Sequence, residues 1–183
     1  MIRLPLLVLS LMMFLSLTAC NGSLPTDANR EDSWIADSYR ELSYSVRNSW
    51  TKDTYETTHS ARYAQSFKEN GSPEGISLDV SRADFYENQE KITDVSVLAE
   101  KIAGGYLSSA GNPSLTYYEP FIVNEFPAYE IWITAEYSPD YKVEIRTILV
   151  EKPDGIYRVD LSAPSDYAGD FASDYQKIKN SLN

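Results

Sequence analysis

An α+β fold, in which helices pack on an antiparallel sheet, is predicted by three features of this sequence. Stretches that alternate between apolar and polar residues recur along the chain and are typical of half-buried strands. Short turn signals link the last three of these stretches, which favours antiparallel pairing. Two further segments repeat apolar residues every three or four positions, and this spacing predicts amphipathic helices that lie on the sheet.

The first half of the folded body is predicted to contain three strands after a short helix or loop. Residues 43–46 alternate and end just before Trp50, and residues 62–68 form a second candidate strand. Residues 75–80 form the third, with one face made of Ile76, Leu78 and Val80. A helix follows Asp94, whose carboxylate suits the N-cap position. Its apolar residues lie on or near one stripe, namely Val95, Leu98, Ile102 and Leu107, and Gly104 and Gly105 leave its end open.

The second half predicts a three-stranded meander and a closing helix. Residues 128–137, 141–150 and 156–161 are the strands, joined by turns at 138–140 and 152–155. Ser165 or Asp166 is expected to cap the last helix. Its apolar residues are spaced by four, four, three and four positions: Tyr167, Phe171, Tyr175, Ile178 and Leu182.

The charge balance excludes one class of partner. The chain has 16 Lys and Arg against 27 Asp and Glu, a formal net charge of -11. Arg3 is the only charge before Cys20, so the part that follows carries 15 minus 27, or -12. We expect no nucleic-acid partner, because phosphates need a basic surface. Solubility explains the acidity better than a specific cation or basic-partner site.

The N-terminus has the layout of a secretory signal peptide. A single cation, Arg3, precedes an apolar run from Leu4 to Leu17, and small residues lead to Cys20. The string Leu17-Thr18-Ala19-Cys20 resembles the lipobox of bacterial lipoproteins. That resemblance implies that the Cys20 thiol receives a diacylglycerol, whose two chains anchor the protein stably on the extracytoplasmic side of a bacterial membrane. The identity of the envelope, and inner against outer membrane, stays open.

Three other interpretations of this segment were weighed. A membrane span needs roughly 20 apolar residues, more than this run supplies, and no amphipathic pattern supports a core helix. A secreted protein with a free thiol remains the third alternative. We therefore expect a signal peptide at residues 1–19, a lipidated N-terminus and tether at 20–40, and one domain at 41–183. The polar residues 21–33 span on the order of 40 Å when extended. With its only cysteine lipidated, the domain has no disulfide and relies on its core.

The order of elements resembles the PsbP family, and more broadly the fold shared by PsbP and Ran-binding proteins of nuclear transport. The resemblance covers roughly residues 41–182 and rests on five strings and a closing Ser181-Leu182. The strings are SYSVRNSW, GISLDV, VSVLAEKI, FPAYEIWITAEY and DGIYRVDLSAP. It implies an α/β/α sandwich around an antiparallel sheet of about six strands, and a non-catalytic role. The lipobox departs from PsbP, so only the fold and the non-enzymatic tendency are carried over, with no binding residues and no cofactor.

The sequence itself contains no recognisable catalytic constellation. His59 is the only histidine and lies in a polar, turn-like stretch, so we expect it to be solvent-exposed; a histidine-pair metal site is excluded by count. Hydrolase, zinc-protease, P-loop and dinucleotide motifs are absent from the sequence. Asp79, Asp84 and Glu87 do not follow EF-hand spacing. No catalytic residue and no cofactor is assigned.

Two groups of acidic and aromatic residues leave alternatives open. Glu130 and Glu136 share a strand face with Trp132 and Thr134, which suits a sugar or cation site, or simply a solvent-facing or helix-covered side of the strand. Four tyrosines lie near strand ends and either line a groove or cover sheet edges: Tyr117, Tyr118, Tyr137 and Tyr141.

The function expected from the sequence is that of an anchored, non-catalytic binding or assembly domain that contacts another envelope protein. The alternatives are a solute-binding or hydrolytic domain that uses acidic and aromatic residues, and a divalent-cation site on the acidic surface. A deep pocket with converging carboxylates would favour these alternatives.

Overall fold

The computed structural model describes residues 33–53, 60–68, 71–84, 86–87, 90–109, 112–167 and 169–183. The predicted signal peptide, Cys20 and His59 lie outside these residues. In chain order the strands are β1 (Trp34–Tyr39), β2 (Leu42–Arg47), β3 (Thr51–Lys52), β4 (Ser60–Phe67), β5 (Pro73–Arg82), β6 (Tyr86–Glu87), β7 (Glu90–Lys91), β8 (Ser114–Val123), β9 (Phe126–Ser138), β10 (Tyr141–Lys152) and β11 (Gly155–Pro164). The helices are α1 (Val95–Leu107) and α2 (Phe171–Ser181).

Seven strands form one antiparallel sheet in the order β3-β4-β5-β11-β10-β9-β8. Its centre is the predicted meander, in which β9, β10 and β11 pair along nearly their whole lengths. β11 is the outer strand of this meander and pairs on its other edge with β5, although β5 and β11 are far apart in sequence. Two shorter ribbons, β1-β2 and β6-β7, stand outside the main sheet. The predicted α+β class is confirmed.

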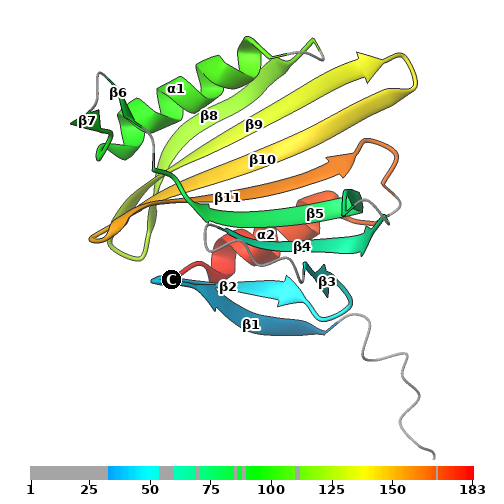
Figure 1. Ribbon diagram of the computed structural model, residues 1–183, viewed down its shortest axis with the longest axis horizontal. Helices are drawn as coiled ribbons and strands as arrows, with labels where there is room; N and C mark the ends of the chain where they lie inside the picture. Colours follow the sequence, from blue (N-terminus) through cyan, green and yellow to red (C-terminus); the bar gives the residue numbers. More distant parts are fainter. Residues whose placement is uncertain are drawn as a thin grey trace, which may run out of the picture.

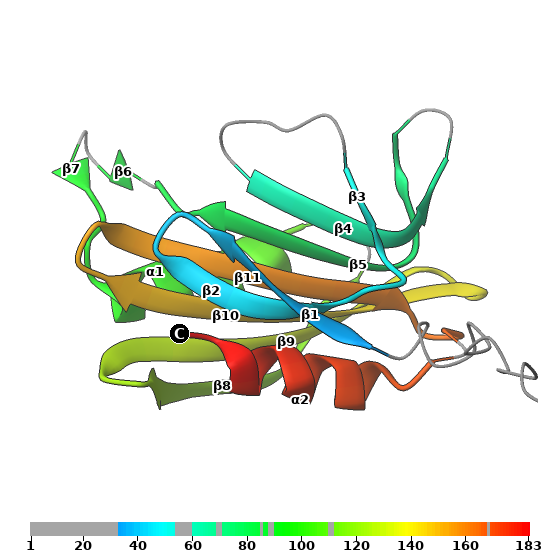
Figure 2. The same cartoon turned by 90° about the horizontal axis from the view of Figure 1, so that it is seen from below.

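The two faces of the sheet are covered differently. Helix α1 contacts β8, β9 and β10, and its buried face packs on Ile131, Ile133 and Leu149. Helix α2 and the β1-β2 ribbon cover the other face, where they enclose the larger apolar cluster. Figure 1 shows α2 behind β5 and β4, with α1 at the β8 end of the sheet. Figure 2 shows α2 and the β1-β2 ribbon from below. The layers are therefore helix, sheet, and helix with ribbon.

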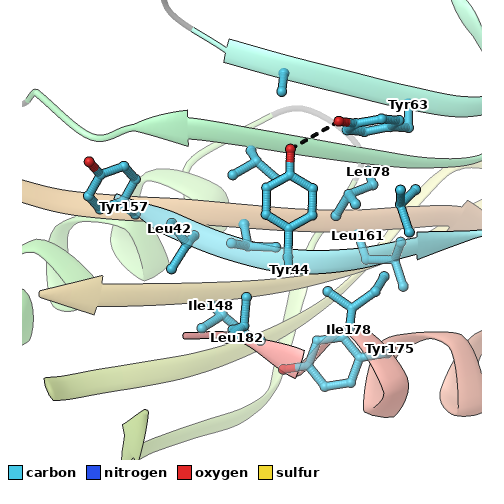
Figure 3. Packing of buried hydrophobic residues seen from close by; sticks show 14 of the residues in the cluster. Leu42, Tyr44, Tyr63, Leu78, Ile148, Tyr157, Leu161, Tyr175, Ile178 and Leu182 are labelled. Carbon is cyan, nitrogen blue, oxygen red and sulfur yellow. Dashed lines mark hydrogen bonds between the residues drawn. The ribbon is translucent and has the colours of Figure 1, made fainter. Parts of the chain in front are cut away.

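The larger core is rich in tyrosine. Tyr44 and Tyr63 are nearly fully buried, and their hydroxyl oxygens lie 3.1 Å apart. Figure 3 shows the two hydroxyls pointing toward each other. Burial is the main cause that raises the pKa of Tyr44 to about 12, and it raises the pKa of Tyr63 as well. Both hydroxyls therefore stay neutral and can hydrogen-bond within the core. These rings supply the buried area that a fold without disulfides needs.

Helix α1 begins where the sequence predicts. Asp94 is its N-cap and accepts a hydrogen bond from the backbone N–H of Ser96 at 2.7 Å. The buried stripe contains Val95, Leu98, Ala99, Ile102 and Ala103. Leu107 is 48% exposed, so its placement on this stripe was wrong. The helix continues through both glycines and ends at Leu107, where Ser108 is the C-cap.

Helix α2 begins later than predicted. Its N-cap is Asp170, and neither Ser165 nor Asp166 caps it. The backbone N–H of Ser165 instead donates to the carbonyl of Lys142 at 2.9 Å, which extends the pairing between β11 and β10. The chain is thus still paired with β10 at Ser165, and the helix begins only after Asp170. Once formed, α2 is held to β2 by an ion pair between Arg47 and the fully buried Asp174.

Two longer strands, β1 and β8, and the two-residue strands β3, β6 and β7 were not predicted. Residues 34–39, expected within the tether as a helix or loop, form β1, which pairs with β2 from Trp34 to Tyr39. Trp34 contributes to the folded body through an edge contact with Trp50 at 6.3 Å between ring centroids. β8 is an edge strand of mostly exposed residues, and together with the short β3 it brings the sheet to seven strands instead of about six.

Candidate functional site

Glu130, the acidic residue of the predicted sugar or cation site, belongs to the interior. It is 3% exposed, beneath α2, and its carboxylate accepts hydrogen bonds from Tyr175 Oη at 2.6 Å and Trp132 Nε1 at 2.7 Å. Lys179 completes the set with an ion pair. Glu136 pairs instead with exposed Lys142 at 3.1 Å. The helix-covered alternative is therefore correct for Glu130, and its carboxylate is occupied by structural partners.

The four tyrosines do not line one groove. Tyr117 stacks on Trp132 and Tyr118 on Tyr129, with ring centroids 4.7 Å and 5.5 Å apart. Because Tyr117 and Tyr118 are consecutive in a strand, these contacts lie on opposite faces of the sheet. Tyr137 and Tyr141 form a separate pair at the β9-β10 turn.

A polar area remains on the α1 side of the sheet, over β4, β5 and β11. We call it the open polar face. The strand register places its charged residues side by side: Arg62 lies opposite Asp79, and Asp79 lies opposite Asp160. No described helix covers it, because α1 lies over β8 to β10 and α2 on the reverse side (Figure 1). Its members are Ser60, Arg62, Ser77, Asp79, Ser81, Arg158, Asp160 and Ser162.

The charged side chains of the open polar face form an ordered row. Arg62 Nε donates to Asp79 Oδ2 at 3.2 Å, and Arg158 Nε lies 2.6 Å from Asp160 Oδ2. The hydroxyl of Thr147 donates to the second oxygen of Asp160 at 2.5 Å. Tyr106 of α1 accepts from Arg158 Nη2, also at 2.5 Å. The helix thus positions one end of the row, while the β4 end is accessible to solvent.

The two carboxylates at the centre of this row repel each other. Burial raises the pKa of Asp79, and the nearby charge of Asp160 adds to the rise, although Arg62 opposes it. Like charges directly opposite on neighbouring strands are destabilising. The side chain of Asp79 is 30% exposed, so solvent relieves only part of this cost. Burial and the charge of Asp160 thus outweigh the two arginines near Asp79, so ionisation of this carboxyl weakens folding.

Replacing Asp79 with asparagine is expected to raise the melting temperature at pH 7. A carboxyl whose pKa is higher in the folded than in the unfolded state destabilises the fold as it ionises. This loss of stability develops as the pH rises from the unfolded-state pKa to the folded-state pKa. The gain from Asp79→Asn should therefore shrink as pH falls toward 3.8 and Asp79 becomes protonated. Thermal unfolding followed by circular dichroism across this pH range measures the effect.

Asp37→Asn provides a control of opposite sign. Burial raises the pKa of Asp37, but hydrogen bonds from Tyr63 and Ser38 outweigh burial and lower this pKa overall. Its stabilising contribution is therefore present at neutral pH and is lost as pH falls, so Asp37→Asn should lower the melting temperature at pH 7. If Asp79→Asn lowers the melting temperature in the same way, the carboxylate of Asp79 is a structural group and this interpretation fails.

The remaining acidic candidates have ordinary surface roles. Asp84 pairs with Lys91 at 2.5 Å and with Arg82 at 3.3 Å.

A depression of about 520 Å³ lies where α1 begins, beside β8 and β9. Its two carboxylates serve the helix terminus: Asp94 caps it, and Glu151 accepts from the Val95 N–H at 3.2 Å. Among the described residues, no group of three or more potential His, Cys, Asp or Glu ligands comes together, and no helix there is long and apolar enough to span a membrane.

Sequence reasoning missed the open polar face, although a signal for it exists. Polar residues occupy alternate positions in two strands whose other positions are apolar: Ser77, Asp79 and Ser81 in one, and Arg158, Asp160 and Ser162 in the other. Such alternation identifies a face that the core does not need. Only the pairing of β5 with β11 shows that the two sets meet.

Comparisons with known proteins show the fold and not the family. No family model and no curated protein matches the chain. Among solved structures, the Ran-binding protein Mog1p of Saccharomyces cerevisiae matches at a TM-score of 0.57 and 9% identity, over 83% of this chain and 95% of that one. Cyanobacterial PsbP from Synechocystis matches at a TM-score of 0.57 and 11% identity, over 91% of this chain and 98% of that one. A protein of unknown function from Pseudomonas aeruginosa matches at a TM-score of 0.51 and 11% identity, over 82% of this chain and 96% of that one. The chain has a PsbP-like fold.

Proposed function

We propose that this protein is a lipid-anchored, extracytoplasmic domain that binds an envelope protein through the open polar face and has no catalytic role. The observation that carries the proposal is the opposed pair Asp79 and Asp160, an arrangement that costs stability on an accessible surface. Natural proteins accept such costs mainly where a function requires them. The lipid anchor is supported by the string Leu17 to Cys20.

The chemistry of the open polar face favours a protein partner. The face is a sheet surface of small serines between charged side chains, and hydroxyls and charges alternate along its strands. A partner cation placed over Asp79 and Asp160 would relieve their repulsion, while its carboxylates or carbonyls would meet Arg62. The similarity to Mog1p, a Ran-binding protein by name, supports binding as a use of this fold.

Site-specific crosslinking in the native membrane tests the proposed function. A photo-crosslinking residue at Ser77 is expected to yield a discrete adduct with one envelope protein, since Ser77 lies beside Asp79 on the open polar face. The matched control carries the same residue at Gln176, on the exposed side of α2. No adduct from position 77, or identical adducts from both positions, would contradict binding through this face.

A further inference from the structure

The turn between β9 and β10 carries an exposed pair of aromatic rings. Tyr137 and Tyr141 are 54% and 51% exposed, and their ring centroids are 5.9 Å apart. Neither ring belongs to the two apolar clusters of the described residues. The pair therefore contributes little to the fold and presents apolar area to the surroundings.

The turn carries three charged side chains, two of which pair with each other. Glu136 and Lys142 form an ion pair at 3.1 Å on either side of the turn. Asp140 is the one further charge among residues 136–142, which gives the turn a formal charge of -1 against -12 for the part after Cys20. Charge therefore does not draw this turn to an acidic lipid surface, and a contact with lipid depends on the two rings.

The turn also lies at the same end of the long axis as the start of β1, the first described strand, as Figures 1 and 2 both show. The thirteen residues 21–33 separate Cys20 from Trp34 and span about 45 Å when fully extended. β9 alone, with 13 residues, is about 43 Å long. To bring the opposite end to the membrane, the tether would also have to pass the length of the domain.

We infer that the β9-β10 turn rests in the headgroup region of the membrane, with Tyr137 and Tyr141 at the boundary between water and lipid. The inference rests on the proposed function, because it requires the anchor at Cys20. Tyrosine suits this boundary, since its ring is apolar and its hydroxyl stays hydrated. Ile35, the second residue of β1, is 45% exposed. In this orientation the open polar face points sideways, toward neighbouring envelope proteins.

A fluorescent label on the turn tests this orientation. Cys20 is the only cysteine and carries the lipid, so a second cysteine can be labelled alone. The lipidated protein with Ser138→Cys receives an environment-sensitive dye and is reconstituted in phosphatidylcholine vesicles. Glu125→Cys, in the exposed β8-β9 turn at the opposite end, is the matched control. We expect a shift to shorter wavelength, and quenching by spin-labelled lipid, at position 138 only. In the Ser138→Cys background, replacing both Tyr137 and Tyr141 with serine should abolish the shift while the protein stays on the vesicles.

The outcomes separate the inference from the proposed function. Protein that stays on the vesicles but shows a fully hydrated dye at position 138, or equal quenching at positions 138 and 125, overturns the contact of the turn with lipid. Protein that does not associate with vesicles at all overturns the anchor and hence the proposed function. A shift that persists after both tyrosines are replaced shows that the rings do not make the contact and overturns their assignment.

Discussion

Replacing Glu130 with alanine is expected to lower the free energy of unfolding by about 2–6 kcal/mol, because a buried donor left without its acceptor costs about 1–3 kcal/mol and two donors lose theirs. Lys179 would lose its counter-ion, and the hydroxyl of Tyr175 and the indole N–H of Trp132 would lose their acceptor. These groups join β9 to α2, so the substitution loosens the layer that covers one face of the sheet. Equilibrium unfolding in urea measures the change.

Glu136→Ala is the matched control for this prediction. Glu136 lies on the same strand and the same face, and its ion pair with Lys142 is exposed at both ends, at 43% and 46% of the side-chain surface. Exposed pairs contribute about 0–1 kcal/mol. If Glu130→Ala costs no more than Glu136→Ala, the buried network does not hold α2 on the sheet and the structural assignment of Glu130 is wrong.

The meander and α1 could be predicted because local sequence determines them. In β9, every second residue from Tyr129 to Ala135 faces α1, and the turns at residues 139–140 and 153–154 contain proline and aspartate. Asp94 marks the start of α1. In each case neighbouring residues supply the signal, and tertiary contacts then agree with it.

β1 and β8 escaped prediction because long-range contacts determine them. β8 is an edge strand whose residues are mostly exposed, so it shows no clear alternation, and Pro120 within it argues against a central strand. β1 follows a polar segment and is stabilised as a strand by pairing with β2 and by the contact of Trp34 with Trp50. Periodicity alone does not reveal such strands.

The candidate site depends on the same kind of information. Asp79 and Asp160 lie far apart in the sequence. In the structure, Asp79 pairs with Arg62 and Asp160 pairs with Arg158. The sequence shows that both are polar positions in otherwise apolar strands. That they repel one another follows only from the register between β5 and β11. Glu130 shows the converse: an acidic residue beside a tryptophan suggested a binding site, and α2 covers it.

Lipid attachment at Cys20 is the premise on which both the envelope partner and the orientation of the β9-β10 turn rest. In cells given a labelled fatty acid, we expect the label in the wild-type protein and a complete loss of it in Cys20→Ala, because the thiol is the acceptor in the motif that Leu17 to Cys20 resembles. The wild-type protein should be recovered with membranes, and the variant should be released or remain unprocessed.

The labelling of Cys20→Ala, measured beside that of the wild type, therefore tests the central claim most directly. Label in the wild type and none in the variant is the predicted result. Equal label in both, or none in either with the wild type recovered outside the membrane fraction, would contradict a lipid-anchored role for this domain.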